Sequence, residues 1–205
     1  MRILGVSGST REHSHSLVLR TVVLEAAPST GGETTVLNLL ETPLPLFRAD
    51  GSYDREHPEI ERVRALTRDA DAYVLVSPEY HGSMSGWMKN YFDFHYYEFG
   101  GKLFGLVAST GGSLGESCLS HMRAAVQYCH GWSLPYHSAA RSADFDASLE
   151  IKAEKIRDRL RFMGRDLVEY GQLLGRQFQS DVNLKSSPGN ESINSGFAAW
   201  HVKTP

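Results

Sequence analysis

A short apolar run followed by small and polar residues places the strongest limit on how this chain can fold. Residues 73–76 form the run, and a helical pattern begins at Gly86. An uninterrupted apolar run with β-branched residues is typical of a parallel strand that is buried on both faces. We expect this strand to end at Ser77-Pro78, because proline has no amide hydrogen to give to a ladder. The loop after it then lies at the carboxyl edge of a parallel sheet, where open α/β sheets place their ligands, and an ordinary βα connection is the alternative.

A hydroxyl-rich loop follows the first predicted strand. Residues 7–16 contain five hydroxyl side chains, one glycine and Arg11, and a helix is predicted from about Leu17. Ser14 and Ser16 are the predicted N-caps of this helix. Free amides, the positive end of the helix dipole, hydroxyl donors and an arginine together suit a phosphate group. A plain capping loop is the alternative, and neither a Walker A ending nor a GxGxxG spacing is present.

The whole chain alternates strands with helices, which implies a doubly wound α/β fold. The predicted strands are residues 3–6, 34–39, 73–76, 102–108 and 132–138, and the predicted helices are residues 17–27, 57–68, 86–94, 116–130 and 151–170. A glycine-rich turn at residues 109–115 is able to bring backbone amides close to a ligand. We expect a domain at residues 1–175 and a tail at residues 176–205, either loose or docked through Phe197, Trp200 and Val202 on the body or on a neighbouring subunit.

Size and charge exclude several classes of protein. The chain has 205 residues and a net charge of -3, so it suits one domain and gives no electrostatic case for binding nucleic acid or a membrane surface. No apolar run approaches the length of a membrane span, and no signal peptide is visible at the start. Cys118 and Cys129 lie too far apart on one predicted helix to form a disulfide, which favours a reduced, cytoplasmic setting. No cysteine and histidine spacing indicates a metal site.

Three stretches make this chain resemble a known family. The chain resembles the NADPH-dependent FMN reductase family in residues 8–16, 77–90 and 109–115. That family includes quinone, azo-dye and chromate reductases and arsenical-resistance flavoproteins. The resemblance covers roughly residues 1–170. It implies a flavodoxin-like, doubly wound, five-stranded parallel sheet of strand order 2-1-3-4-5 flanked by helices, in which three loops meet at one edge and bind FMN.

The resemblance also assigns residues to parts of FMN. The phosphate is expected at Ser9, Arg11, Ser16 and the Leu17 amide; one side of the ring at Pro78, Glu79, Tyr80, His81 and Gly82; the other side at Ser109, Thr110, Gly111, Gly112 and Ser113. This sequence departs from the family at His81, where asparagine is usual, and at Ser85, where proline is usual. The first departure puts one polar contact to the flavin in doubt, and the second is expected to loosen the loop and alter substrate access.

The activity implied is the transfer of two electrons from NADPH or NADH through FMN to a quinone, a free flavin or a similar acceptor, by ping-pong exchange. The chemistry belongs to FMN, so no catalytic side chain is required, and Tyr80 and His81 are only weak candidates for a proton donor. The surplus of aromatic residues after Gly86 and the resemblance together suggest a dimer or tetramer.

Two other functions fit parts of the sequence. Residues 111–115 match the GxSxG elbow of α/β serine hydrolases. In that interpretation Ser113 is the nucleophile, with Asp144 or Asp146 as the acid and His201 or His137 as the base. The other alternative is a flavin-binding electron carrier or sensor without turnover, although such carriers are typically much more acidic than this chain.

Overall fold

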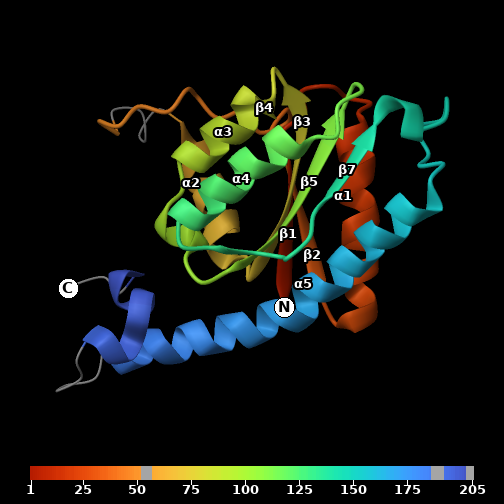
Figure 1. The fold of residues 1–205 in the computed structure, drawn as a ribbon. Helices are drawn as coiled ribbons and strands as arrows, with labels where there is room; N and C mark the ends of the chain where they lie inside the picture. Colours follow the sequence, from red (N-terminus) through yellow and green to blue (C-terminus); the bar gives the residue numbers. More distant parts are fainter. Residues whose placement is uncertain (52–56, 186–191, 202–205) are drawn as a thin grey trace.

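Parallel strands form the centre of the protein, and helices cover both faces of the sheet (Figure 1). The structure is a computed structural model that describes residues 1–51, 57–185 and 192–201. Its strands are β1 (Arg2–Ser7), β2 (Glu33–Asn38), β3 (Ala72–Tyr80), β4 (Ser83–Met84), β5 (Leu103–Thr110), β6 (Trp132–Ser133) and β7 (Ser138–Arg141). Its helices are α1 (His15–Ala26), α2 (Pro58–Asp69), α3 (Gly86–Asp93), α4 (Glu116–Tyr128) and α5 (Glu154–Lys185), with short 3-10 helices η1 (Ala27–Thr30), η2 (Tyr97–Phe99), η3 (Ser142–Asp144) and η4 (Ser192–His201).

The strand order confirms the predicted flavodoxin-like sheet. The main path is β2-β1-β3-β5-β6, and every pairing along it is parallel. The short strand β7 also pairs in parallel with β5, farther along the strand than β6 does. Because β4 is a small extra strand that pairs only with β3, the order corresponds to the predicted 2-1-3-4-5.

Successive side chains of a strand point to opposite faces of the sheet, so the strands contribute to two separate cores. Leu4 and Tyr73 belong to one core, whereas Ile3 and Val74 belong to the other. Helices α2, α3 and α4 cover the sheet face of the first core, and α1 and α5 cover that of the second (Figure 1). A strand buried on both faces must be apolar throughout, which explains the continuous apolar runs in the sequence. Gly105 allows α5 to approach β5, because a Cβ there would lie 2.7 Å from a methionine sulfur of that helix.

Strand β3 is longer than predicted. It continues to Tyr80 instead of ending at Ser77-Pro78, and beyond the parallel ladder it turns back on itself, with Glu79 opposite Met84 of β4. Proline removes only its own amide donor, and the residues around it keep theirs. The prediction that Pro78 ends the strand is therefore wrong.

The predicted fifth strand is two strands. β6 and β7 are separated by residues 134–137, which include Pro135, and each pairs with a different part of β5. The prediction of one continuous strand over residues 132–138 is therefore wrong. The two cysteines also lie differently from the prediction, because Cys129 follows the end of α4 while Cys118 lies inside it; both are buried and free.

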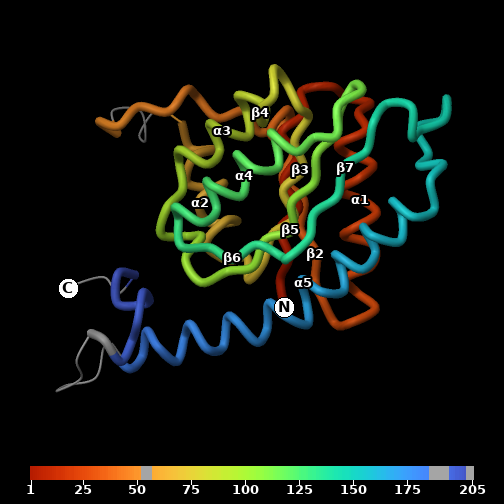
Figure 2. Tube along the Cα trace, in the orientation of Figure 1, coloured from red at the N-terminus to blue at the C-terminus, as the bar shows by residue number. Residues whose placement is uncertain are grey.

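The last helix is longer than its apolar pattern indicates. It was expected to end near Tyr170, but α5 continues to Lys185 for a total of 32 residues. The boundary predicted at residue 175 falls inside this helix, and the division into a domain and a tail stays a prediction. η4 lies beside the end of α5 (Figure 2). In η4, Phe197 contacts the rings of Trp132 and Phe178. Val202 lies outside the described residues.

Candidate functional site

A polar pocket lies where three parallel strands end. The carboxyl ends of β1, β3 and β5 meet at one edge of the sheet, on the side of the molecule where the β3–β4 hairpin stands (Figure 1). Its walls are Ser9, Arg11, His13, Ser14, His15, Ser16, Pro78, Glu79, Tyr80, Ser109, Thr110, Gly111 and Ser142. The pocket measures about 270 Å³. Hollows of about 990 and 700 Å³ lie along α5, and neither has the carboxyl end of a strand in its wall.

The first wall is the turn from β1 into α1. Ser14 is the N-cap of α1, as predicted, because its side chain accepts a hydrogen bond of 3.3 Å from the Leu17 amide. Ser9 Oγ similarly accepts from the Arg11 amide at 3.3 Å. Burial, and then the charge of Arg11, lower the pKa of His15 below its ordinary value. The wall thus combines the positive end of a helix dipole with hydroxyls and an arginine, which is a setting that attracts an anion.

Ser16 has a different place from the one predicted. It lies inside α1 and is buried, so it does not cap the helix. Its hydroxyl forms a hydrogen bond of 2.7 Å with the Ser109 hydroxyl at the end of β5. The first and third walls of the pocket are therefore joined by a buried contact between residues 93 positions apart.

The second wall is a hairpin rather than the open loop that the sequence predicts. Strands β3 and β4 are joined by His81 and Gly82, whose φ angles are +51° and +73°. Two positive φ angles in succession are what a type I′ hairpin turn requires, and asparagine followed by glycine is the favoured pair there. The histidine at position 81 therefore occupies a turn position where asparagine is the favoured residue before glycine. Both residues are exposed at the tip, while Tyr80, at 43% exposure, lines the pocket.

Ser85 holds this hairpin to the rest of the site. Its amide donates to Ser77 Oγ at 2.9 Å, and its hydroxyl donates to the Gly8 carbonyl at 2.7 Å. The same hydroxyl accepts from the Met88 amide at 3.1 Å and so caps α3. The expectation that serine loosens this loop, compared with proline, stays a prediction; the buried serine makes three hydrogen bonds there.

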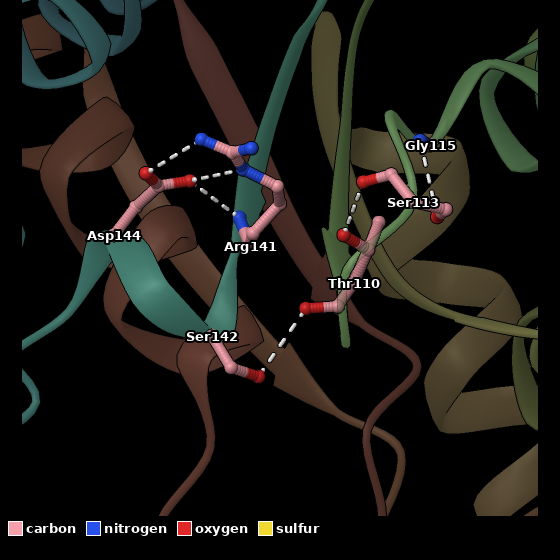
Figure 3. Close-up of polar contacts among 6 residues, drawn as sticks. All are labelled: Thr110, Ser113, Gly115, Arg141, Ser142 and Asp144. Carbon is pink, nitrogen blue, oxygen red and sulfur yellow. Dashed lines mark hydrogen bonds and ion pairs between the residues drawn. The ribbon is translucent and has the colours of Figure 1, made fainter.

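The third wall is the end of β5, and a neighbouring strand supports it. Ser109 and Thr110, predicted to lie in a turn, are the last two residues of β5. Figure 3 shows Ser142 pointing at Thr110 from the segment that follows β7; the hydroxyl donates to the Thr110 carbonyl at 3.3 Å. Thr110 Oγ1 in turn donates to the Ser113 carbonyl at 2.7 Å, which fixes the start of the loop.

Nine of the fourteen residues predicted to bind FMN line this pocket. They are Ser9, Arg11, Ser16, Pro78, Glu79, Tyr80, Ser109, Thr110 and Gly111, whereas Leu17, His81, Gly82, Gly112 and Ser113 do not line it. The pocket also includes His13, Ser14, His15 and Ser142, which were not among the predicted ligands. His13, Ser14 and His15 could have been predicted from their position in the loop before α1, whereas nothing in the sequence indicated Ser142.

The chemistry of the pocket walls suits FMN. The turn at the start of α1, with its hydroxyls and arginine, and the flat, partly exposed Tyr80 face the same pocket. Its volume of about 270 Å³ lies just below the range of roughly 300–1,000 Å³ that is typical of ligand pockets. Ser9, Arg11 and the first turn of α1 are placed to hold the phosphate, and the ends of β3 and β5 to hold the ring.

The residues of the hydrolase alternative are not assembled. Ser113 Oγ donates to a carboxylate oxygen of Glu79 instead of facing a histidine. Asp144 turns toward Arg141, whose amide donates to it at 2.8 Å, and it points away from Ser113 in Figure 3. His137 contacts Arg123, and the ring of His201 contacts His130 at 2.8 Å. Asp146 accepts bonds from Ser148 and Glu150.

Nothing in the described ranges gathers three or more metal-ligating side chains at one place. Across those ranges, the helices are also too short or too polar to cross a membrane.

Comparisons with known proteins point to one family. Residues 1–146 match the family described as NADPH-dependent FMN reductase. The chain is 28% identical over 184 residues to an FMN-dependent NADPH-azoreductase of Staphylococcus aureus, across 83% of this chain and 95% of the relative. The corresponding protein of Staphylococcus saprophyticus is 26% identical over 178 residues, with the same coverage.

Solved structures share the fold at low sequence identity. The flavoenzyme FerB, an NAD(P)H:(acceptor) oxidoreductase of Paracoccus denitrificans, matches with a TM-score of 0.69 and 18% identity over 84% of this chain and 98% of that one. An archaeal flavodoxin matches with a TM-score of 0.59 and 13% identity over 84% and 99%. These likenesses bear on the fold alone.

Proposed function

Because the chain belongs to the NADPH-dependent FMN reductase family, we propose that it passes two electrons from NADPH, or NADH, through FMN to a small aromatic acceptor. The acceptor is a quinone, a free flavin or an azo compound, the last suggested by relatives that are named azoreductases. The observation that carries the proposal is the convergence of three strand ends on one polar pocket at the start of α1.

We assign the phosphate to the first wall. Ser9, Arg11 and Ser14 bind it together with the amides at the start of α1, where the helix dipole favours negative charge. The Leu17 amide already donates to Ser14, and Ser16 is bonded to Ser109. These two residues therefore contribute by shaping the cradle that the others line.

We assign the ring to the other walls. Pro78, Glu79 and Tyr80 follow one side of it, with His81 and Gly82 forming the turn above, and residues 109–113 follow the other side. When bound, FMN supplies a ring that takes a hydride from the nicotinamide and returns two electrons to the acceptor. Backbone amides of the glycine-rich loop are suited to stabilise the negative charge that a reduced flavin carries.

Donor and acceptor are proposed to use the same open side of the pocket in turn, which gives ping-pong kinetics. Tyr80 has 43% of its surface exposed there and offers a flat face to either molecule. In this scheme no side chain of the chain forms a covalent bond, and Tyr80 and His81 remain the candidates for proton donation.

A spectroscopic titration tests the proposal. The purified protein with added FMN is expected to show a shifted flavin spectrum and quenched flavin fluorescence, and the colour should bleach with NADPH under anaerobic conditions. Arg11→Ala should weaken FMN binding, while Arg62→Ala, at an exposed site on α2, should leave it unchanged. Absence of FMN binding at micromolar protein would refute the function; bleaching without reoxidation by any quinone or azo compound would favour the electron carrier.

We also propose that the protein self-associates as a dimer or tetramer in the cytoplasm, with no nucleic-acid or membrane partner. The exposed rings of Trp87, Tyr97 and Tyr128 support an interface between subunits. The net charge of -3 supports the absence of a polyanionic partner. Sedimentation velocity checks the assembly state.

A further inference from the structure

One carboxylate joins two walls of the pocket. Glu79 is half-buried near the end of β3 and lines the pocket. Its Oε2 accepts a hydrogen bond from Ser113 Oγ, and its Oε1 accepts from the Cys118 amide at 3.4 Å. The side chain therefore reaches from β3 both to the loop at residues 111–115 and to the first turn of α4.

Helix α4 has no cap of its own. Its N-cap residue is Gly115, which has a φ of +76° and no side chain that can accept a hydrogen bond. An N-cap side chain normally accepts from the second or third amide of the helix, and Cys118 is the third residue of α4. Glu79 fills this role from a neighbouring strand, and its negative charge meets the positive end of the helix dipole. Burial and the charge of Glu79 raise the pKa of the Cys118 thiol to about 12.

The loop that Glu79 reaches has little else to hold it. Gly111 and Gly112 are exposed, and a Cβ added at either position would meet nothing within 4 Å. Thr110 Oγ1 donates to the Ser113 carbonyl. The Gly115 amide donates to Ser113 Oγ over a long distance of 3.4 Å. A loop with two adjacent glycines needs such a tether to keep its amides in one arrangement.

We propose that Glu79 is a positioning residue that clasps the 111–115 loop and the start of α4 against β3. The clasp fixes the loop amides beside the flavin ring, and this role rests on the proposed function. It differs from the direct flavin contact that the family resemblance implies, because both carboxylate oxygens are already occupied by protein donors.

The first test does not need FMN. Hydrogen exchange of the Cys118 amide, which donates to Glu79, is expected to quicken at least tenfold in the flavin-free Glu79→Ala protein, and to stay near the wild-type rate in Glu79→Gln, whose amide oxygen can still accept from Cys118. Glu116→Gln, an exposed acid in the same helix turn, is the matched control and should not change the rates. Unchanged exchange in Glu79→Ala would overturn the clasp, whether or not the protein binds FMN.

The second test measures how the clasp acts on the site. Glu79→Ala is expected to raise the FMN dissociation constant about tenfold, equal to about 1.4 kcal/mol. Ser113→Ala should raise it less, and the double variant should be no weaker than Glu79→Ala alone, because both changes break one contact. Glu79→Gln should rescue binding to within about threefold of wild type.

The outcomes separate the two ideas. Wild-type protein that never binds FMN refutes the proposed function, and the exchange data still decide the clasp. FMN binding that is equal in wild type and Glu79→Ala, or additive losses in the double variant, would overturn the positioning role. Ser113 is exposed, so Ser113→Ala keeps the test open if Glu79→Ala fails to fold.

Discussion

Replacement of Ser85 by proline, the residue usual in the family, should destabilise this protein. The backbone itself would accept proline, because Ser85 has a φ of -60° and the preceding residue, Met84, is in an extended strand. Proline would even stabilise the fold by about 0.4–1 kcal/mol, since it limits the unfolded chain. The contacts made by this serine oppose that gain.

The magnitude follows from three hydrogen bonds. Loss of the cap on Met88 costs about 1 kcal/mol. Loss of the donor to the Gly8 carbonyl costs about 1 kcal/mol more, and loss of the amide bond to Ser77 costs a similar amount. After the gain from chain restriction, we expect Ser85→Pro to lower the free energy of unfolding by about 2 kcal/mol.

Urea unfolding of the flavin-free protein measures this change, with thermal unfolding as a second readout. A loss of about 2 kcal/mol corresponds to a fall in Tm of about 4–8 °C for a chain of this size. Ser85→Ala keeps the amide bond but loses both hydroxyl bonds, so it should be destabilised by a similar amount. Ser120→Ala, at an exposed position of α4, is the control and should stay within about 0.5 kcal/mol of wild type. A proline variant as stable as wild type would show that these hydrogen bonds do not hold the hairpin.

Three further changes test other parts of the structure. His81→Asn should raise the free energy of unfolding by about 0.5 kcal/mol, because asparagine is better suited to the positive φ before Gly82. A lower free energy of unfolding in urea would show that the turn is formed differently. Gly164→Ala should lower the free energy of unfolding by about 1–3 kcal/mol, since the new Cβ would lie 2.2 Å from the Val23 carbonyl oxygen where α5 crosses α1. An unchanged free energy of unfolding would contradict that close packing. Burial lowers the pKa of His95 to about 4, so the unfolded chain takes up this proton first as the pH falls below about 6.5. The free energy of unfolding should therefore drop by up to about 1.4 kcal/mol per pH unit down to about pH 4. Chemical unfolding measured across that range should show a flatter decline for His95→Gln.

Local patterns in the sequence were enough to predict the sheet and most of the pocket. Each wall begins with a buried strand and continues into small, polar residues, and parallel strands bring such ends together whatever the rest of the chain does. Ser9, Tyr80 and Ser109 could be found in this way. The β3–β4 hairpin was missed although a signal existed, because His81-Gly82 stands where an Asn-Gly turn pair is common.

Contacts that depend on tertiary pairing left no such signal. Ser142 reaches the pocket only because β7 lies beside β5, and Glu79 meets Ser113 only after two loops have been placed. The length of α5 was underestimated for a different reason. Tyr170 and Leu173 are about half exposed, so the apolar stripe fades while the helix itself continues.

The bond between Ser16 and Ser109 has a consequence for when the pocket is completed during synthesis of the chain. Ser16 leaves the ribosome early, but its hydroxyl partner is made 93 residues later, and Ser142 later still. A nascent chain that stops short of these positions has no complete pocket, whatever its secondary structure. The three walls of the pocket can therefore come together only after residue 142 has been made.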